Sequence, residues 1–179
     1  MTEQEGYLHV PGGRVWYRSV GESTGDRAPL LCLHGGPGFT HHYLEPLEAL
    51  ADRRQVVFYD QLGCGRSGRP DDLSLWTVDR FVEEVAQVSA ALGLTRLHLF
   101  GSSWGGMLAM QYVAVPTLLV GGRYDECTPS HLADMHRRIR GSQLRIIEDA
   151  SHLCFAEQPA EFAEIVNSFF DLTDRGSGL

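Results

Sequence analysis

Short apolar segments alternate with amphipathic segments along most of the chain. Apolar runs without period-2 alternation lie at residues 30–33, 56–59, 97–100, 117–120 and 144–147. Strands that are apolar on both faces are typical of a parallel sheet covered by helices on each side. Two further segments, 7–10 and 14–20, flank a Pro-Gly-Gly turn and predict an antiparallel hairpin.

The segments between these runs carry apolar residues at helical spacing. Their stripes fall within residues 81–92, 132–139 and 162–170, and residues 107–113 form a further helix-forming run. Alternating strands and helices predict an α/β fold with a doubly wound, mostly parallel sheet. The length of 179 residues, with 43% hydrophobic and 21% charged residues, fits one domain spanning the chain.

A G-x-S-x-G pattern lies at residues 101–105, directly after the strand 97–100 and before a helix-forming segment. This is the context of a nucleophile elbow, where glycines avoid collision in a sharp strand-to-helix turn. Serine is a poor nucleophile until a base removes its proton, so the pattern requires a histidine held by a carboxylate. Asp125 and His152 each follow a predicted strand. The chain order therefore predicts a triad of Ser103, Asp125 and His152, although each residue alone is more often structural.

A glycine-rich segment, HGGPG, occupies residues 34–38 directly after the first apolar run. The chain order Ser, Asp, His predicts the α/β-hydrolase fold, which carries its oxyanion loop at this place. Glycine there lets a backbone N–H approach the developing negative charge. We predict the N–H groups of Gly36 and Trp104 as oxyanion donors and Gly35 and Pro37 as substrate contacts. A plain glycine turn is the alternative.

Two other patterns suggest different chemistry. G-x-G-x-x-G at residues 63–68 follows a strand, as in dinucleotide-binding folds, but a loop continues where a helix should begin. His34, His41 and His42 suggest a metal site, but no nearby set of Asp, Glu or Cys completes a ligand pattern. We therefore expect no cofactor and no metal ion.

Composition and charge argue against some classes of binding partner and bear on the cellular location. The formal net charge of −8 argues against nucleic acid, because no basic run is present to neutralise phosphates. No window approaches the ~18 apolar residues of a membrane span, and the N-terminus lacks a signal pattern, so we expect a cytoplasmic protein. The four cysteines are far apart and are expected to be reduced thiols.

Five motifs together resemble the proline iminopeptidase family of serine peptidases and the related amino-acid amidases. They are HGGPG at 34–38, DQLGCGRS at 60–67, GSSWGG at 101–106, GGRYDECTP at 121–129 and ASHLCFAEQP at 150–159. The resemblance implies release of N-terminal residues, proline foremost, from small peptides, amides or esters through an acyl-enzyme. It implies the same triad of Ser103, Asp125 and His152, and a loop at 60–67 that shapes the site floor.

The chain departs from that family after the nucleophile helix. Family members carry another sheet strand and a long helical cap there, including the acidic residues that hold the substrate's amino group, whereas here residues 107–113 run almost directly into the segment 115–117. A helix over 104–114 descends ~16 Å and a strand over 116–121 climbs ~20 Å. We therefore expect Asp125 to return to the sheet edge that bears Ser103.

Several alternatives stay open at this stage. The strand at 117–121 either pairs beside the nucleophile strand or leaves a gap in the sheet. A cap-less esterase of broad specificity, including a thioesterase or lipase-like enzyme, has the same core motifs. The remaining alternative is an inactive hydrolase-fold core that binds partners or self-associates through apolar surface that the missing cap exposes.

Overall fold

The computed structural model describes residues 2–24, 26–112, 116–139 and 141–175. The chain divides into two compact units, Met1–Ala114 and Val115–Leu179, here called the first and the second unit. Each is described by itself, and the organisation of the whole chain as one domain stays a prediction.

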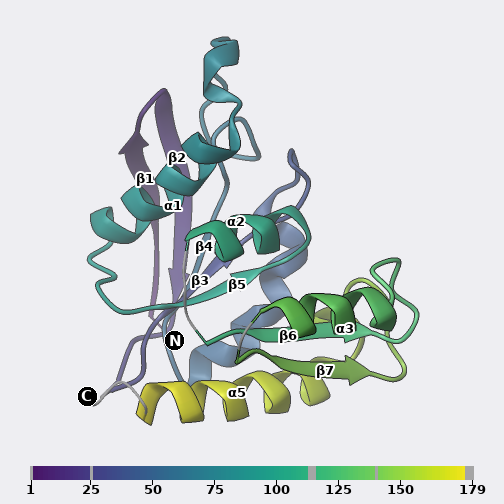
Figure 1. Ribbon diagram of the computed structural model, residues 1–179. Helices are drawn as coiled ribbons and strands as arrows, with labels where there is room; N and C mark the ends of the chain where they lie inside the picture. The colour runs from purple at the N-terminus through teal and green to yellow at the C-terminus, as the bar shows by residue number, and fades with distance from the viewer. Residues whose placement is uncertain (1, 25, 113–115, 140, 176–179) are drawn as a thin grey trace. The chain divides into compact units, whose positions relative to one another are not determined.

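The first unit is built on a five-stranded sheet. Its strands are β1 (Glu3–Val10), β2 (Gly13–Val20), β3 (Leu30–Leu33), β4 (Val56–Tyr59) and β5 (His98–Gly101). Their order is β1-β2-β4-β3-β5, with β1 and β2 antiparallel to their neighbours and β4, β3 and β5 mutually parallel (Figure 1). The predicted hairpin is confirmed, and its first strand begins at Glu3 rather than at Tyr7.

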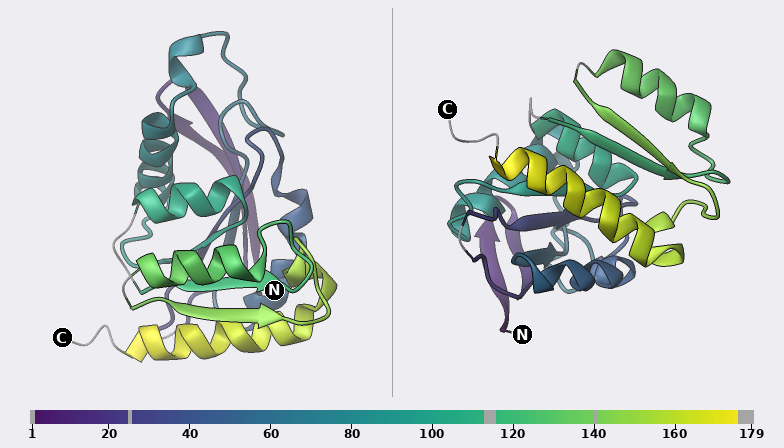
Figure 2. Two further views of the ribbon diagram at one scale, coloured as in Figure 1. Left: turned by 45° about the vertical axis from the view of Figure 1, so that its right-hand side comes forward. Right: turned by 90° about the horizontal axis from the view of Figure 1, so that it is seen from below.

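Helices cover both faces of this sheet. They are η1 (His41–Asp52), η2 (Leu73–Leu75), α1 (Val78–Ala91) and α2 (Trp104–Tyr112). Figures 1 and 2 show α1 and α2 on one face and η1 on the other. The sequence analysis missed η1, although its buried Leu44, Leu47 and Leu50 recur at a helical spacing of three. Residues 113 and 114 of the predicted nucleophile helix lie outside the described residues.

The central strands are buried on both faces because successive side chains point to opposite sides of a sheet. Leu31 of β3 and Val57 of β4 belong to the cluster that packs with α1 and α2. Their neighbours Leu30 and Val56 are also buried, and strand alternation points them to the opposite face. The unbroken apolar runs therefore correspond to strands that helices cover on both faces, as the sequence predicts.

The second unit is a two-stranded parallel sheet with helices. Its elements are β6 (Leu118–Gly122), α3 (Pro129–Arg138), β7 (Gln143–Ile147), α4 (Cys154–Glu157) and α5 (Pro159–Arg175). Figure 1 shows α3 and α5 on opposite faces of this sheet. β6 pairs with β7 in parallel. The place of residues 117–121 relative to the nucleophile strand, which belongs to the first unit, stays a prediction.

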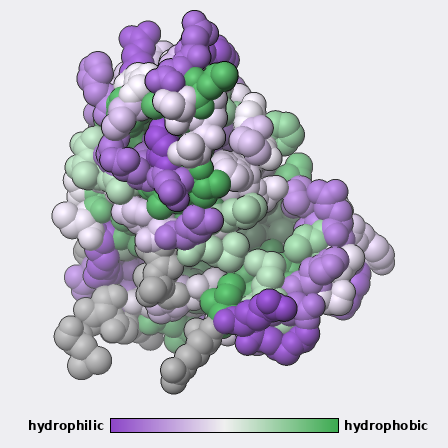
Figure 3. All heavy atoms as spheres, turned by 45° about the horizontal axis from the view of Figure 1, so that its top comes forward, coloured by the Kyte–Doolittle hydropathy of each residue, from purple (hydrophilic) through white to green (hydrophobic). Residues whose placement is uncertain are grey.

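The link between α2 and β6 consists of residues 113–117 alone. This length leaves no room for an inserted helical cap. No helix in the described ranges is long and apolar enough to cross a membrane. On the face seen in Figure 3, hydrophobic side chains lie among hydrophilic ones.

Candidate active site

Ser103 lies in the sharp turn between β5 and α2. Its φ of +52° is in the left-handed region, and among the described residues it is the one non-glycine residue with positive φ. Such backbone costs of the order of 1–3 kcal/mol and is found mainly where the surrounding structure enforces it for function. The Ser103 side chain is exposed, as a nucleophile must be. The predicted elbow is therefore present as a local structure.

Glycines let the elbow pack against the neighbouring strand. A Cβ at Gly105 would lie 2.1 Å from Leu33 O, and one at Gly101 would lie 2.4 Å from Gly105 O. Ser102 N–H donates to Leu33 O at 3.1 Å, which ties the turn to the end of β3. The flanking glycines are thus required by backbone contact, as the G-x-S-x-G pattern predicts.

The glycine-rich loop after β3 lies beside the elbow. A Cβ at Gly35 would lie 3.2 Å from Ser103 Cβ, and Gly35 N–H donates to Tyr43 Oη at 2.6 Å. Gly36 has a φ of +122° and is exposed. In the described part of the chain, the N–H groups of Gly36 and Trp104 have no acceptor. Two N–H groups on adjoining segments are therefore available to an external oxygen.

Gln61 joins the glycine-rich loop to the elbow. Its side chain is fully buried, and its Nε2–H donates to His34 O at 2.8 Å. Its Oε1 accepts a hydrogen bond from Trp104 Nε1–H at 3.0 Å. Its backbone N–H also donates to His34 Nε2 at 3.0 Å. The sequence analysis gave Gln61 no individual role, because the bonds that define it span distant parts of the chain.

Both ring nitrogens of His34 have hydrogen-bond partners. Its Nδ1 lies 2.9 Å from Gly35 O, and its Nε2 accepts from the backbone N–H of Gln61. Burial lowers the pKa of His34, which favours the neutral ring that can accept at Nε2. His34 therefore shapes the loop, and neither of its nitrogens is left for a metal ion.

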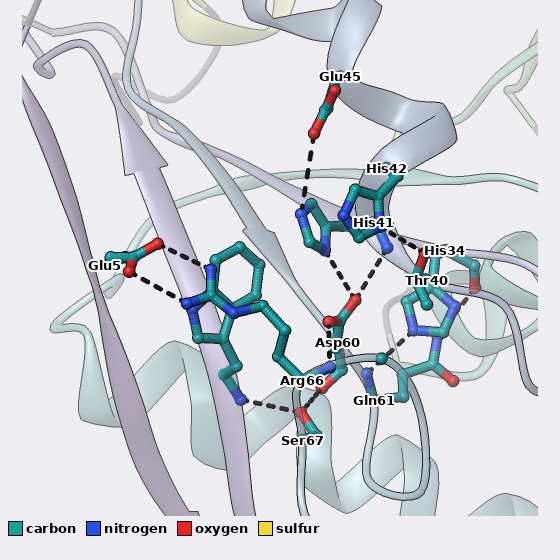
Figure 4. A network of polar contacts seen from close by, with 12 residues as sticks. Glu5, His34, Thr40, His41, His42, Glu45, Asp60, Gln61, Arg66 and Ser67 are labelled. Carbon is teal, nitrogen blue, oxygen red and sulfur yellow. Dashed lines mark hydrogen bonds and ion pairs between the residues drawn. The ribbon is translucent and has the colours of Figure 1, made fainter.

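Asp60 organises the loop that follows β4 (Figure 4). Its Oδ1 accepts from the backbone N–H of His41 at 2.9 Å and lies 2.8 Å from His41 Nδ1. Its Oδ2 accepts from Arg66 N–H at 2.8 Å. Burial alone would raise the pKa of Asp60, but the hydrogen bonds from His41 and Arg66 outweigh it and lower the pKa.

The same loop needs glycine where it wraps around the carboxylate. A Cβ at Gly65 would lie 2.1 Å from Asp60 Oδ2, and Gly65 has a φ of +46°. Ser67 Oγ donates to Asp60 O at 2.5 Å and accepts from Trp16 N–H at 2.8 Å. Gly65 of the G-x-G-x-x-G pattern therefore makes room for an internal carboxylate. The next helical segment begins only at Leu73.

An apolar cavity of about 390 Å³ opens in the first unit. Its walls include Pro37, Leu62, Cys64, Trp76, Phe81 and Trp104. Phe81 and Trp104 meet edge to face, with ring centroids 5.7 Å apart. Because Pro37 and Trp104 belong to the two segments with available N–H groups, the cavity adjoins them. The sequence analysis missed Trp76 and Phe81 as cavity walls, since an aromatic residue at a helix start also fits a core.

The second unit brings together the other two predicted triad residues. Asp125 lies just after β6 and His152 lies after β7, and His152 Nδ1 is 2.9 Å from Asp125 Oδ1. The Asp125 side chain is 9% exposed and that of His152 is 40% exposed. Glu126 lies farther from the ring, at 3.8 Å, and is 82% exposed. Asp125 is therefore the carboxylate that holds the imidazole.

Backbone hydrogen bonds hold these two loops against each other. Arg123 N–H donates to Ile147 O at 2.9 Å, and Tyr124 N–H donates to Ala150 O at 3.0 Å. A Cβ at Gly122 would lie 2.3 Å from Ala150 O, so only glycine permits this approach. Parallel pairing of β6 with β7 places both carboxyl ends at one edge, where the carboxylate and the imidazole meet.

Glu157 fixes the turn that carries the histidine. Its carboxylate accepts from Ser151 N–H at 2.7 Å, from Ser151 Oγ at 2.7 Å and from Leu153 N–H at 3.0 Å. Hydrogen bonds from Ser151 lower the pKa of Glu157, which keeps this carboxylate ionised as an acceptor. The sequence analysis did not identify this residue. The approach of the Asp125–His152 pair to Ser103 stays a prediction.

Comparison with known proteins identifies the fold. A family described as the α/β-hydrolase fold matches residues 28–115. A proline iminopeptidase crystal structure from Mycobacterium smegmatis aligns with 97% of this chain and 100% of that chain, with a TM-score of 0.92 and 20% identity. At that identity the likeness concerns the fold. The predicted α/β-hydrolase fold is therefore confirmed.

The sequence of this chain is similar to those of several proline iminopeptidases. The proline iminopeptidase of Clostridium botulinum is 50% identical over 113 residues, which are 63% of this chain and 39% of that protein. The proline iminopeptidase of Lacticaseibacillus rhamnosus is 34% identical over 176 residues, which are 92% of this chain and 57% of that protein. The first relatives are thus matched over about two fifths of their length. The chain belongs to the proline iminopeptidase family of α/β-hydrolase-fold proteins.

Proposed function

We propose that this chain is a serine hydrolase that cleaves small amides and esters through an acyl-enzyme. Ser103 attacks the acyl carbon, and His152 takes the Ser103 proton and returns it to the leaving amine or alcohol. Asp125 holds the imidazole in one tautomer and stabilises its cation. The N–H groups of Gly36 and Trp104 bind the oxyanion, and Gly35 and Pro37 contact the substrate.

The left-handed backbone of Ser103 is the observation that carries this proposal. A non-glycine residue at a φ of +52° needs the surrounding structure to hold it there. Here that structure is a strand-to-helix turn packed against a loop with unused N–H donors. A plain structural turn needs neither the strain nor the donors, so their coincidence favours a nucleophile.

The carboxylate–imidazole pair supports the same mechanism. With Asp125 accepting from Nδ1, the lone pair of a neutral His152 lies on Nε2, which is the atom that must accept the serine proton. The His152 side chain is 40% exposed, so the ring is partly accessible. The mechanism requires that the pair reach Ser103 and that His152 Nε2 be free to accept the serine proton.

The substrate class follows from the cavity and from the relatives. The apolar walls at Trp76, Phe81 and Trp104 suit an uncharged, apolar acyl or side-chain group. The relatives are named proline iminopeptidases, so an N-terminal proline is the favoured residue. Residues 113–117 alone lie between α2 and β6, so no cap is inserted at this point of the chain, and we expect activated esters and aryl amides to react faster than peptides.

A fluorophosphonate probe tests the proposal directly. We expect the folded wild-type protein to be labelled at Ser103 and to hydrolyse p-nitrophenyl acetate and proline p-nitroanilide. Ser103→Ala should lose labelling and turnover, whereas Ser102→Ala, which removes the adjacent hydroxyl, should keep the label. Equal rates in the wild type and in Ser103→Ala would refute the catalytic role.

A cap-less core that self-associates is the second candidate. Met107 and Met110 on α2 are 49% and 43% exposed, which leaves apolar side chains on the helix that follows the elbow. Absence of labelling in a folded protein that forms dimers by light scattering would favour this candidate. A monomeric protein that is labelled would exclude it.

A further inference from the structure

Three potential metal ligands gather at the start of η1. They are His41, His42 and Glu45, whose ligand atoms lie within 4.8 Å of one another. His41 Nε2 is 4.0 Å from Glu45 Oε1, and the two imidazole rings stack with centroids 4.2 Å apart. Figure 4 shows Glu45 on the side of the histidine rings opposite Asp60. The sequence analysis found no acidic ligand for these histidines, and Glu45 supplies one.

Hydrogen bonds leave the same nitrogen free on both rings. His41 Nδ1 lies 2.8 Å from Asp60 Oδ1, and that carboxylate also accepts a backbone N–H, so it acts as the acceptor of the ring proton. His42 Nδ1 lies 2.8 Å from Thr40 Oγ1, which can accept in the same way. Each ring then carries its lone pair on Nε2, the atom that a metal ion requires.

The buried Asp60 carboxylate contacts His41 in the way that an outer-shell carboxylate contacts a metal-bound histidine. Metal-bound histidines almost always donate their second ring N–H to a carboxylate, a carbonyl or water, which fixes the ring and raises its basicity. Asp60 is fully buried and His41 is 3% exposed, so this orientation is held by the core rather than by solvent. His42 and Glu45 are exposed and can adjust.

We propose that His41 Nε2, His42 Nε2 and the Glu45 carboxylate bind one divalent transition-metal ion, with zinc as the ion that this donor set fits. Zinc binds histidine nitrogen and carboxylate oxygen at about 2.0–2.2 Å, and three protein ligands leave one position for water. Ligand atoms around one ion lie roughly 3–4 Å apart, so small rotations of His42 and Glu45 close the site. The site does not depend on the proposed hydrolase activity.

Titration with Zn²⁺ by calorimetry tests the site on the full chain. We expect one site in the wild type, and affinity losses in His42→Ala and Glu45→Gln larger than the 10–100-fold typical of losing an outer-shell partner. Both residues are exposed, so these variants should fold. His9→Ala removes an exposed histidine of β1 and serves as the matched control, with unchanged binding.

Thermal unfolding supplies a readout that does not involve catalysis. Saturating Zn²⁺ should raise the melting temperature of the wild type and of His9→Ala, and a chelator should reverse the rise. His42→Ala and Glu45→Gln should show no rise. The proposal is overturned if the wild type binds no Zn²⁺, if either ligand variant binds it as tightly as the wild type, or if His9→Ala loses binding equally.

Discussion

The indole Nε1–H of Trp104 donates a hydrogen bond to Gln61 Oε1, and Gln61 Nε2–H in turn donates to His34 O. One buried side chain therefore joins the two segments whose N–H groups are the proposed oxyanion donors. Because electrostatic stabilisation depends on donors that are already in place, this bridge should matter for catalysis and for stability.

Gln61→Leu should reduce both activity and stability. The substitution leaves Trp104 Nε1 and His34 O without their partner, which costs roughly 1–3 kcal/mol in the free energy of unfolding. We expect kcat to fall by about tenfold or more, and KM to change little, because the oxyanion forms only after binding.

A second glutamine provides the control for this measurement. Among the described residues, the Gln55 side chain donates to Ser19 Oγ at 2.8 Å and makes no hydrogen bond to either proposed donor segment. Gln55→Leu should lower stability while leaving kcat and fluorophosphonate labelling near wild-type values. A Gln61→Leu protein that is folded and has an unchanged kcat would show that the bridge is only structural.

Gly105→Ala should destabilise the elbow strongly. The new methyl would lie 2.1 Å from Leu33 O and 2.9 Å from His34 O, so β3 or α2 must shift. We expect a loss of several kcal/mol in the free energy of unfolding, measured by urea denaturation, since overpacking against backbone typically costs ~1–3 kcal/mol or more.

A substitution at the adjacent Gly106 distinguishes the effect of a steric clash from the effect of replacing a glycine. A methyl at Gly106 would meet Gly101 O at 3.2 Å, which a small shift relieves, and alanine is a better helix former. Gly106→Ala should therefore be much less destabilising than Gly105→Ala. Equal losses in the two variants would contradict the contact argument.

Asp60→Asn should alter the dependence of stability on pH. The folded-state pKa of Asp60 is lowered from 3.8, so its ionised form stabilises the fold above that pH. That contribution is lost as pH falls below 3.8 through the lower folded-state value. The wild type should exceed the variant by roughly 1–3 kcal/mol at neutral pH.

Urea denaturation between pH 3 and 7 measures this difference. The gap between the wild type and Asp60→Asn should be constant above about pH 5 and should narrow below about pH 4. A gap that widens in acid would mean that the carboxylate is not stabilised in the folded protein. Asp72, whose pKa is also lowered by hydrogen bonds from Ser74, lies on the surface, and Asp72→Asn supplies a control with a small effect.

The thiols should be protected from alkylation in the folded protein. Burial raises the pKa of Cys154 to about 11 and also raises that of the half-exposed Cys127. Because the thiolate is the reactive form, iodoacetamide at pH 8 should modify Cys154 very slowly and Cys127 faster. Mass spectrometry should find all four cysteines modified in urea. Rapid labelling of Cys154 in the native protein would contradict its burial.

The sequence alone determined the strands and the elbow. Residues 30–33 and 56–59 lack polar positions because both faces of a parallel strand are covered, and that requirement is visible in every residue of the run. The elbow was predictable because its geometry also restricts the residue type. A Cβ at residue 101 or 105 would collide with backbone, so glycine is required at both positions. Local constraints of this kind leave local signals.

Tertiary structure alone decided the contacts between distant residues. Gln61 meets Trp104 across 43 positions and His34 across 27, and Asp60 reaches His41 across 19. Nothing in the periodicity of a strand or helix specifies such partners, because they depend on which strand ends lie side by side. The pairing of β6 with β7 likewise depends on which strand edges meet in space, and a one-dimensional pattern does not specify that.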